Sequence, residues 1–182
     1  MPVLIHLNGP SGVGKSTLAQ RYVDEHPGVL NLDIDAVVSL IGGWRDDFFV
    51  MLSPARDIAV AMADAHLRNG CDVVMPQLVT SVDQADRFEL VAERAGADYV
   101  EIALTVDVAE QIRRFRVKAS CSEVNAYVDQ AVEAEGGDDL LRRIHRHFGT
   151  YLDQRSMAFR LSTSGAGVSQ SYAQMLAVLN DG

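Results

Sequence analysis

Short runs of apolar residues alternate along the chain with longer segments in which apolar residues recur every three or four positions. The short runs are typical of buried strands and the longer pattern of amphipathic helices. Strands are therefore expected at residues 3–8, 29–32, 71–75, 99–106 and 158–161. Helices are expected at residues 15–25, 36–41, 53–69, 81–95, 108–118, from 138 onward and at 168–179, with a less regular, partly helical segment at 119–137.

Local sequence signals place several helix ends. Ser53 and Pro54 suit the N-cap and first helical position of one helix, and Ser81 begins a capping-box-like sequence for the next. Gly70 and Gly96 follow as C-terminal stops. In the helix expected at residues 53–69, apolar residues three or four positions apart predict a buried stripe that includes Ile58, Met62 and Ala65.

Regular alternation of strands with helices predicts an α/β fold, a parallel sheet covered by helices on both faces. At 182 residues the chain is expected to form a single domain, residues 1–182. Ligands of such sheets bind beyond the carboxyl ends of the strands. That rule predicts that Asp33, Asp35, Gln77, the turn at residues 9–17 and the loop after the fifth strand converge on one cleft.

The turn at residues 9–17 reads GPSGVGKST and follows an expected strand directly. It fits the phosphate-binding pattern G-x-x-x-x-G-K-[ST], in which glycines let successive backbone N–H groups point at phosphate oxygens and a helix N-terminus adds positive charge. The alternative, a chance glycine-rich turn, does not account for the strand before it and the helix after it. The pattern predicts a nucleoside triphosphate site formed by Gly9, Ser11, Gly12, Val13, Gly14, Lys15, Ser16 and Thr17. Lys15 would reach the β- and γ-phosphates, and the Ser16 hydroxyl would ligate Mg²⁺.

Two acids, Asp33 and Asp35, end the second expected strand and lie on the same side of an extended backbone. A phosphoryl acceptor needs a carboxylate near its hydroxyl proton, and a metal beside the phosphates can use a second one. One of the two could instead be only the N-cap of the helix that follows, a position that Asp35 suits.

Composition narrows the possible partners. The net charge of −9 disfavours a nucleic-acid backbone, although a local basic groove stays possible. The longest apolar runs fall well short of a membrane span. Only two cysteines, Cys71 and Cys121, are present, without metal-site spacing, so a reducing, cytoplasmic setting is expected.

The phosphate loop followed by a strand and Asp-x-Asp resembles the P-loop kinases of small molecules, the group that includes shikimate kinase, chloramphenicol phosphotransferase and the zeta-toxin type. The resemblance is specific in the loop, fair at residues 33–40 and weak elsewhere. It implies a three-layer fold with a five-stranded parallel sheet in the order 2-3-1-4-5 and a small helical lid, here about residues 113–137. It also implies Asp33 on the metal side and Asp35 as the base at the acceptor hydroxyl.

In the lid, Arg114 matches the family's adenine-side arginine and Lys118 lies one turn beyond. Either residue could instead belong to a solvated basic face at a helix C-terminus. Arg113 and Arg116 are further candidates. The sequence departs from shikimate kinase after the third strand, where Pro76–Gln77 replaces a glycine-rich substrate turn, so shikimate is not expected as the acceptor.

The acceptor site is expected between Trp44, Arg45, Arg56 and Gln77. Trp44 could stack on a planar substrate or fill the core. Arg45 and Arg56 could bind an anionic acceptor or pair with neighbouring aspartates.

These features predict an ATP- and Mg²⁺-dependent kinase that transfers the γ-phosphate to a hydroxyl of a small molecule, such as an antibiotic, a nucleoside or a similar metabolite. Two alternatives remain open: a nucleotide-dependent switch or ATPase that acts on a protein partner, and a kinase that acts on a polynucleotide end. The acceptor, the preference for ATP over GTP and the oligomeric state do not follow from the sequence.

Overall fold

The computed structural model describes residues 1–118 and 122–181. Five parallel strands form one sheet in the order β2-β3-β1-β4-β5, which confirms the expected topology. The strands are β1 (Val3–Asn8), β2 (Leu30–Asn31), β3 (Val73–Met75), β4 (Asp98–Thr105) and β5 (Phe159–Ser162). Each overlaps its expected range, and β2 and β3 are shorter than the apolar runs that indicated them.

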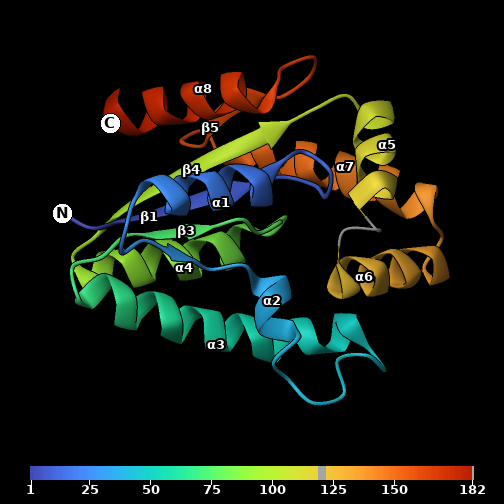
Figure 1. Cartoon of the computed structure of the whole chain (residues 1–182), viewed down its shortest axis with the longest axis horizontal. Helices are drawn as coiled ribbons and strands as arrows, with labels where there is room; N and C mark the ends of the chain where they lie inside the picture. The colour runs from blue at the N-terminus through green and yellow to red at the C-terminus, as the bar shows by residue number, and fades with distance from the viewer. Residues whose placement is uncertain (119–121, 182) are drawn as a thin grey trace.

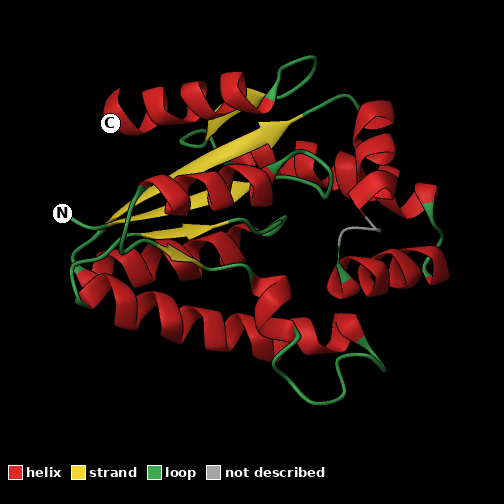
Figure 2. Ribbon diagram, in the orientation of Figure 1, coloured by secondary structure: helices red, strands yellow, loops and turns green. Residues whose placement is uncertain are grey.

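Helices cover both faces of the sheet and extend beyond one end of it (Figure 1). The helices are α1 (Lys15–Glu25), α2 (Ile34–Val38), α3 (Phe48–Arg68), α4 (Val82–Ala95), α5 (Val108–Lys118), α6 (Glu123–Ala134), α7 (Asp138–Gln154) and α8 (Val168–Asp181). Helices α1 and α8 lie on one face and α3 and α4 on the other, while α5 and α6 lie beyond the carboxyl ends of the strands (Figure 2).

Strand β1 forms the centre of both cores because its side chains alternate between the two faces. Ile5 and Leu7 are fully buried in the core beneath α1 and α8, whereas Leu4 packs with α3 and α4. Two polar residues, His6 and Asn8, point to the same side as Leu4 and are also fully buried. A strand buried on both faces is expected of a parallel sheet, but buried polar side chains need partners.

Helix α3 begins earlier than the sequence signal indicated. Its N-cap is Asp47, whose Oδ1 accepts a hydrogen bond of 3.0 Å from the Val50 N–H, so the prediction of Ser53 as N-cap is wrong and Pro54 lies inside the helix. Burial of Phe48, which is 6% exposed, favours the added turn. A proline at this depth removes one intrahelical hydrogen bond, and the packing of the first turn outweighs that loss.

The inner face of α3 also differs from the expected stripe. The buried residues are Phe48, Ala55, Ala59, Ala63 and Leu67, whereas Ile58 is 43% exposed. A row of alanines lets α3 approach α2 and α4 closely, which rotates Ile58 outward. Helix α4 has its expected bounds, and Gly96 ends it with a φ of 67°, but the Ser81 side chain makes no capping bond.

His6 forms hydrogen bonds with a residue that follows β3 and with a residue of β4. Its Nε2–H donates to the Gln77 carbonyl at 2.9 Å, which leaves Nδ1 to accept from the Tyr99 hydroxyl at 2.8 Å. Burial lowers the pKa of His6 to about 4, and the nearby charge of Glu101 only partly opposes the shift.

The fold should therefore lose stability in mild acid. Because the pKa of His6 is lower in the folded chain than in the unfolded chain, the unfolded state binds the proton first, and stability falls as the pH drops from about 6.5 towards 4. We expect His6 to account for about 2 kcal/mol of lost unfolding free energy between pH 7 and pH 5. Denaturant unfolding at several pH values measures this free energy. Its dependence on pH should weaken in His6→Gln and persist in the exposed control His147→Gln. An equal pH dependence in all three proteins would contradict the attribution to His6.

Candidate active site

The phosphate loop between β1 and α1 is held in a conformation that requires glycine. Gly9, Gly12 and Gly14 have φ values of 148°, 94° and 103°. A Cβ at Gly9 would lie 2.6 Å from the Leu104 carbonyl oxygen, and a Cβ at Gly12 would lie 2.6 Å from the Gln111 carbonyl oxygen. The loop is therefore wedged between the end of β4 and helix α5, and its glycines serve close packing as well as backbone curvature.

Asn8 fixes the start of this loop. Its Oδ1 accepts from the N–H groups of Gly9 and Val79, at 2.8 and 2.9 Å, and its Nδ2 donates to the Val79 carbonyl and to Glu101 Oε1. One buried amide thus uses its donors and acceptors to join the phosphate loop to the segment after β3 and to β4. The sequence analysis missed this residue, because an asparagine before a glycine ordinarily indicates only a turn.

Glu101, which accepts a hydrogen bond from Asn8, is the centre of a network of hydrogen bonds and ion pairs. The Tyr151 hydroxyl and Arg155 Nε also donate to Glu101, and Arg155 pairs with Asp86 and Glu89 as well. Burial works against ionisation of Glu101, but the charge of His6, the bonds from Asn8 and Tyr151 and the charge of Arg155 hold the pKa of its carboxyl below its usual range.

Lys15 is the buried cation of the loop, with 8% of its surface exposed. Its Nζ donates to the Gly9 and Pro10 carbonyls at 2.6 and 3.0 Å. Burial and the charge of Lys118 lower the pKa of Lys15 to about 7, while Asp35 and Asp33 act in the opposite direction. The two predicted acids therefore lie within electrostatic reach of the predicted phosphate lysine.

Asp33 and Asp35 have different local environments. Asp33 is the N-cap of α2, since its Oδ1 accepts from the Asp35 N–H at 3.0 Å; the capping role considered for Asp35 belongs to Asp33. Burial and the negative charge of Asp33 raise the pKa of Asp35, and Lys118, Lys15 and Arg56 counteract part of the rise. A carboxylate with a raised pKa is a stronger base than an ordinary aspartate.

A cavity of about 490 Å³ lies between the phosphate loop, α5 and the loop that joins β5 to α8. Eight residues predicted for nucleotide binding line it: Gly12, Val13, Gly14, Lys15, Ser16, Thr17, Arg114 and Lys118. Gly9 is not among its lining residues, and Ser11 lines a second cavity instead. The volume is within the usual range for sites of drug-sized ligands.

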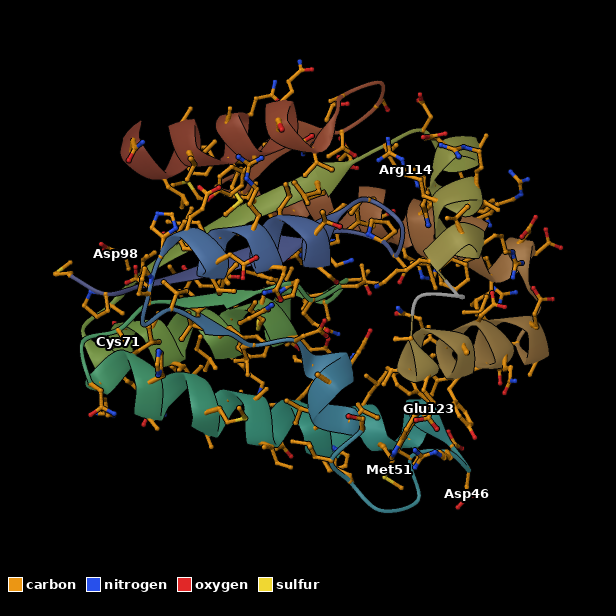
Figure 3. All side chains as sticks on the ribbon, in the orientation of Figure 1. Asp46, Met51, Cys71, Asp98, Arg114 and Glu123 are labelled. Carbon is orange, nitrogen blue, oxygen red and sulfur yellow. The ribbon has the colours of Figure 1, made fainter. Side chains whose placement is uncertain are left out.

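Arg114 joins α5 to the β5–α8 loop on the wall of this cavity, where Figure 3 labels it. Its Nε donates to Glu110 at 2.8 Å, and its terminal nitrogens donate to the Thr163 hydroxyl and carbonyl. The Thr163 hydroxyl in turn donates towards the carbonyls of Val13 and Thr105. Thr163 thus links the phosphate loop to the side of the cavity expected to hold the base.

The second cavity, of about 130 Å³, contains three of the predicted substrate residues, Asp35, Arg56 and Gln77. Its remaining walls are mainly apolar side chains that the sequence analysis did not select: Phe48, Phe49, Leu52, Pro76, Leu78, Val128, Val132, Leu141 and Ile144. They come from α3, the segment after β3, α6 and α7. The meeting of the helical residues depends on the tertiary packing of α6 on α3 and of α7 on α6, which the sequence pattern does not indicate.

The two cavities share Lys15, Ser16 and Lys118. A phosphoryl group positioned at these side chains would have the larger cavity on one side and Asp35 on the other. The two cavities therefore meet at these three side chains, and neighbouring sites are what a direct transfer between two bound molecules would need.

Trp44 and Arg45 lie elsewhere. Trp44 is 4% exposed, belongs to the core formed with α2 and α3, and packs edge-on against Tyr127 of α6 at 4.9 Å between ring centres. Arg45 stacks over the Trp44 ring and pairs with Glu123 at 2.8 Å, near the start of α6 (Figure 3). Neither residue is among those that line the two cavities. Their contacts instead join the loop before α3 to α6.

Arg116 belongs to the packing of the same region. It pairs with Asp129 and Glu133 of α6 and with Asp138 of α7, and so joins three helices. Arg113 pairs with Glu110 and lines the larger cavity. Of the lid expected at residues 113–137, residues 113–118 end α5 and Glu123–Ala134 form α6, whereas residues 119–121 lie outside the described part of the chain. The lid itself stays a prediction.

Ser16 and Asp33 offer a hydroxyl and the second carboxylate oxygen of a capping residue, and oxygen donors of this kind fit Mg²⁺. Within residues 1–118 and 122–181, no group of three or more His, Cys, Asp or Glu side chains could hold a metal ion. A serine hydroxyl and one carboxylate oxygen are too few ligands for Mg²⁺ alone, so a cation held by Ser16 and Asp33 would need further oxygen ligands from phosphates or water.

A family model described as "AAA domain" matches residues 4–141, about three quarters of the chain. The chain belongs to this family. The match begins in β1, includes the phosphate loop and the two acids, and ends in the first turn of α7. A search of curated proteins finds no match.

Solved structures share the AAA domain protein's fold over nearly its whole length. A protein of Chloroflexus aurantiacus described as a candidate kinase superposes with a TM-score of 0.66 at 16% identity and covers 99% of this chain and 95% of its own. The Deinococcus radiodurans tunicamycin resistance protein gives 0.63 at 15% identity, covering 98% and 96%. Deoxyadenosine kinase of M. mycoides, with bound dCTP, gives 0.58 at 12%, covering 98% and 99%.

A chain of the Pnkp1/Rnl/Hen1 RNA repair complex gives a TM-score of 0.63 at 14% identity, covering 84% of this chain and 46% of its own. At these identities the likeness shows the fold, which is that of P-loop kinases.

The packing of the AAA domain's phosphate loop can be separated from backbone strain by substitution. Gly12 and Gly28 have similar positive φ values, 94° and 97°, but a Cβ would clash only at Gly12. Each alanine should cost about 1–2 kcal/mol of strain. We expect Gly12→Ala also to push the loop away from α5 and weaken nucleotide binding at least ~10-fold, since the loop amides must converge on phosphate.

Titration with a fluorescent ATP analogue, beside thermal unfolding, measures both effects. Gly28→Ala is the control and should bind nucleotide as the unmodified protein does. Normal binding by Gly12→Ala would contradict the role assigned to the contact with Gln111.

Proposed function

We propose that this protein is an ATP- and Mg²⁺-dependent kinase that transfers the γ-phosphate to a hydroxyl of a small molecule. The observation that carries the proposal is the meeting of the two cavities at Lys15, Ser16 and Lys118, with Asp35 on the wall of the smaller one. A hydrolase or switch that needs only a nucleotide and water has no use for a second, largely apolar cavity.

The larger cavity would hold ATP. Phosphates would bind the N–H groups of the loop at residues 9–17 and the Lys15 ammonium, and the base would lie towards Arg114. Ser16 and Asp33 would hold Mg²⁺, which supplies charge neutralisation at the phosphate oxygens when bound. Preference for ATP over GTP rests on the family resemblance.

Asp35 would act on the acceptor. As the hydroxyl oxygen forms its bond to the γ-phosphorus and the bond from that phosphorus to the bridging oxygen of ADP breaks, the hydroxyl proton passes to the Asp35 carboxylate. Lys15 and Lys118 would stabilise the charge on the transferring phosphoryl group. ADP and a phosphate monoester leave, and Asp35 returns its proton to solvent.

The fold comparisons support this class of activity, because proteins described as a deoxyadenosine kinase and a candidate kinase share the fold over their whole length. The proposed acceptor is a small molecule with a hydroxyl; antibiotics, nucleosides and similar metabolites are the classes that the family resemblance suggests. Among the described residues no helix is both long and apolar enough to cross a membrane; a cytoplasmic location stays a prediction.

A kinase acting on a polynucleotide end is the second candidate, favoured by the likeness to a chain of an RNA repair complex. The net charge of −9 disfavours it. Salt-dependent binding of a short oligonucleotide, with label transferred to its 5′ end, would replace our proposal with this one. Acceptor-independent ATP hydrolysis faster than any transfer would instead indicate an ATPase or switch.

Removal of the proposed base tests the mechanism directly. Asp35→Asn keeps the size of the side chain but cannot accept the proton, so we expect transfer to fall by at least ~100-fold while ATP affinity changes little. A screen of nucleosides, antibiotics, sugars and hydroxy acids with γ-labelled ATP, read for labelled product, provides the assay.

The matched control is Asp98→Asn, at the start of β4 and at the opposite end of the sheet (Figure 3). It should retain full transfer. Normal turnover by Asp35→Asn would show that another group accepts the proton.

A further inference from the structure

Arg56 lines the smaller cavity from α3 with one hydrogen-bonding group unused. Its Nε is buried, yet no hydrogen-bond partner for it exists within residues 1–118 and 122–181. No ion pair within 4.0 Å is formed by Arg56 in that part of the chain either. A buried N–H without a partner is costly, and guanidinium groups favour planar oxygen anions. A bound molecule with such a group would satisfy it.

The charges around this cavity favour an anion. Lys15, Arg56 and Lys118 line it together with a single carboxylate, Asp35. Lys15 and Lys118 are shared with the larger cavity, where the proposed function assigns them to the phosphates, so Arg56 is the cation that is left for the acceptor. Asp35 and Arg56 influence one another electrostatically but form no ion pair. Two opposite charges on the walls of one cavity, without direct contact, leave room for a ligand between them.

The rest of the cavity limits the body of that ligand. Phe48, Phe49 and Leu52 of α3 face it from one side, and Val128 of α6 and Ile144 of α7 complete an apolar lining. The volume of about 130 Å³ is well below the roughly 300–1,000 Å³ typical of drug-sized sites. A compact apolar body fits this space better than a sugar ring with several hydroxyls, whose polar groups would lose their water without replacement.

We propose that the acceptor is a compact hydroxy acid, with its hydroxyl at Asp35, its apolar body between α3 and α6, and its carboxylate on Arg56. This rests on the proposed kinase function and deepens it. Arg56 is then the residue that selects charged acceptors, and the polar ends of the substrate are read by two side chains on opposite walls.

A probe series tests the charge and the length of the acceptor. The probes are 4-hydroxybutyrate, 6-hydroxyhexanoate and 4-(hydroxymethyl)benzoate, each beside its primary amide, which keeps the hydroxyl and the shape but removes the charge. Binding is measured by calorimetry in the presence of a non-hydrolysable ATP analogue, and transfer is measured separately with γ-labelled ATP. We expect at least one acid to bind at least ~10-fold more tightly than its amide.

Three variants test whether Arg56 causes the tighter binding of the acid than of its amide. Arg56→Gln should bind acid and amide equally, and Arg56→Lys should retain part of the difference because it keeps the charge but not the planar pair of donors. Arg94→Gln, an exposed arginine near the end of α4 that lines neither cavity, should keep the whole difference. Thermal unfolding checks that each variant is folded, and Arg56→Lys preserves the test if Arg56→Gln is not.

Equal binding of every acid and its amide by the unmodified protein would overturn the proposal, as would an undiminished preference in both Arg56 variants. The outcomes also separate this proposal from the function on which it rests. Label transfer to neutral alcohols without any preference for acids would leave the kinase and remove the hydroxy acid. Selective binding of acids, together with no labelled product from any acceptor in the wider screen, would establish an anion site at Arg56 and remove the kinase.

Discussion

The wedge of the phosphate loop between β4 and α5 is the constraint on which the rest of this structure depends. Gly9 and Gly12 approach the backbone of Leu104 and Gln111 too closely for any side chain, and Asn8 ties the loop to the segment after β3. Because the same loop forms the floor of the larger cavity and contributes Lys15 and Ser16 to the smaller one, its placement sets both sites together. Loss of one of these contacts would move the two cavities relative to each other.

Charged side chains at the two cavities differ in their pairing from charged side chains buried elsewhere. Buried acids and bases away from the cavities are directly paired, as in the contacts of Glu101 with Asn8, Tyr151 and Arg155. At the cavities the pattern differs, since the Arg56 Nε lacks a partner in the described part of the chain and Asp35 has a raised pKa. Groups with perturbed pKa values in a cleft are candidates for chemistry, whereas paired ones stabilise the fold. This contrast is an argument for the proposed site that does not depend on the sequence motif.

The helices beyond the sheet complete the site by packing. Arg116 joins α5 to α6 and α7, and Trp44 with Arg45 joins the loop before α3 to α6. Trp44 and Arg45, which the sequence analysis expected in the acceptor site, therefore contact α6, which forms part of the wall of the smaller cavity, and do not line that cavity themselves. An aromatic residue beside a polar loop carries no local signal that separates these roles, because the difference depends on whether another helix covers it.

The sequence by itself determined the order of strands and helices along the chain and the phosphate loop with its lysine, since these depend on short-range periodicity and on a nine-residue pattern, while the role of the acid pair stays a prediction. It also indicated Arg114, Lys118 and Gln77, whose places follow from the edge of a parallel sheet. Tertiary structure decided which acid caps α2, where α3 begins and which of its faces is buried. It alone brought Phe48, Val128 and Ile144 to one cavity, because they come from three helices whose mutual packing no local pattern encodes.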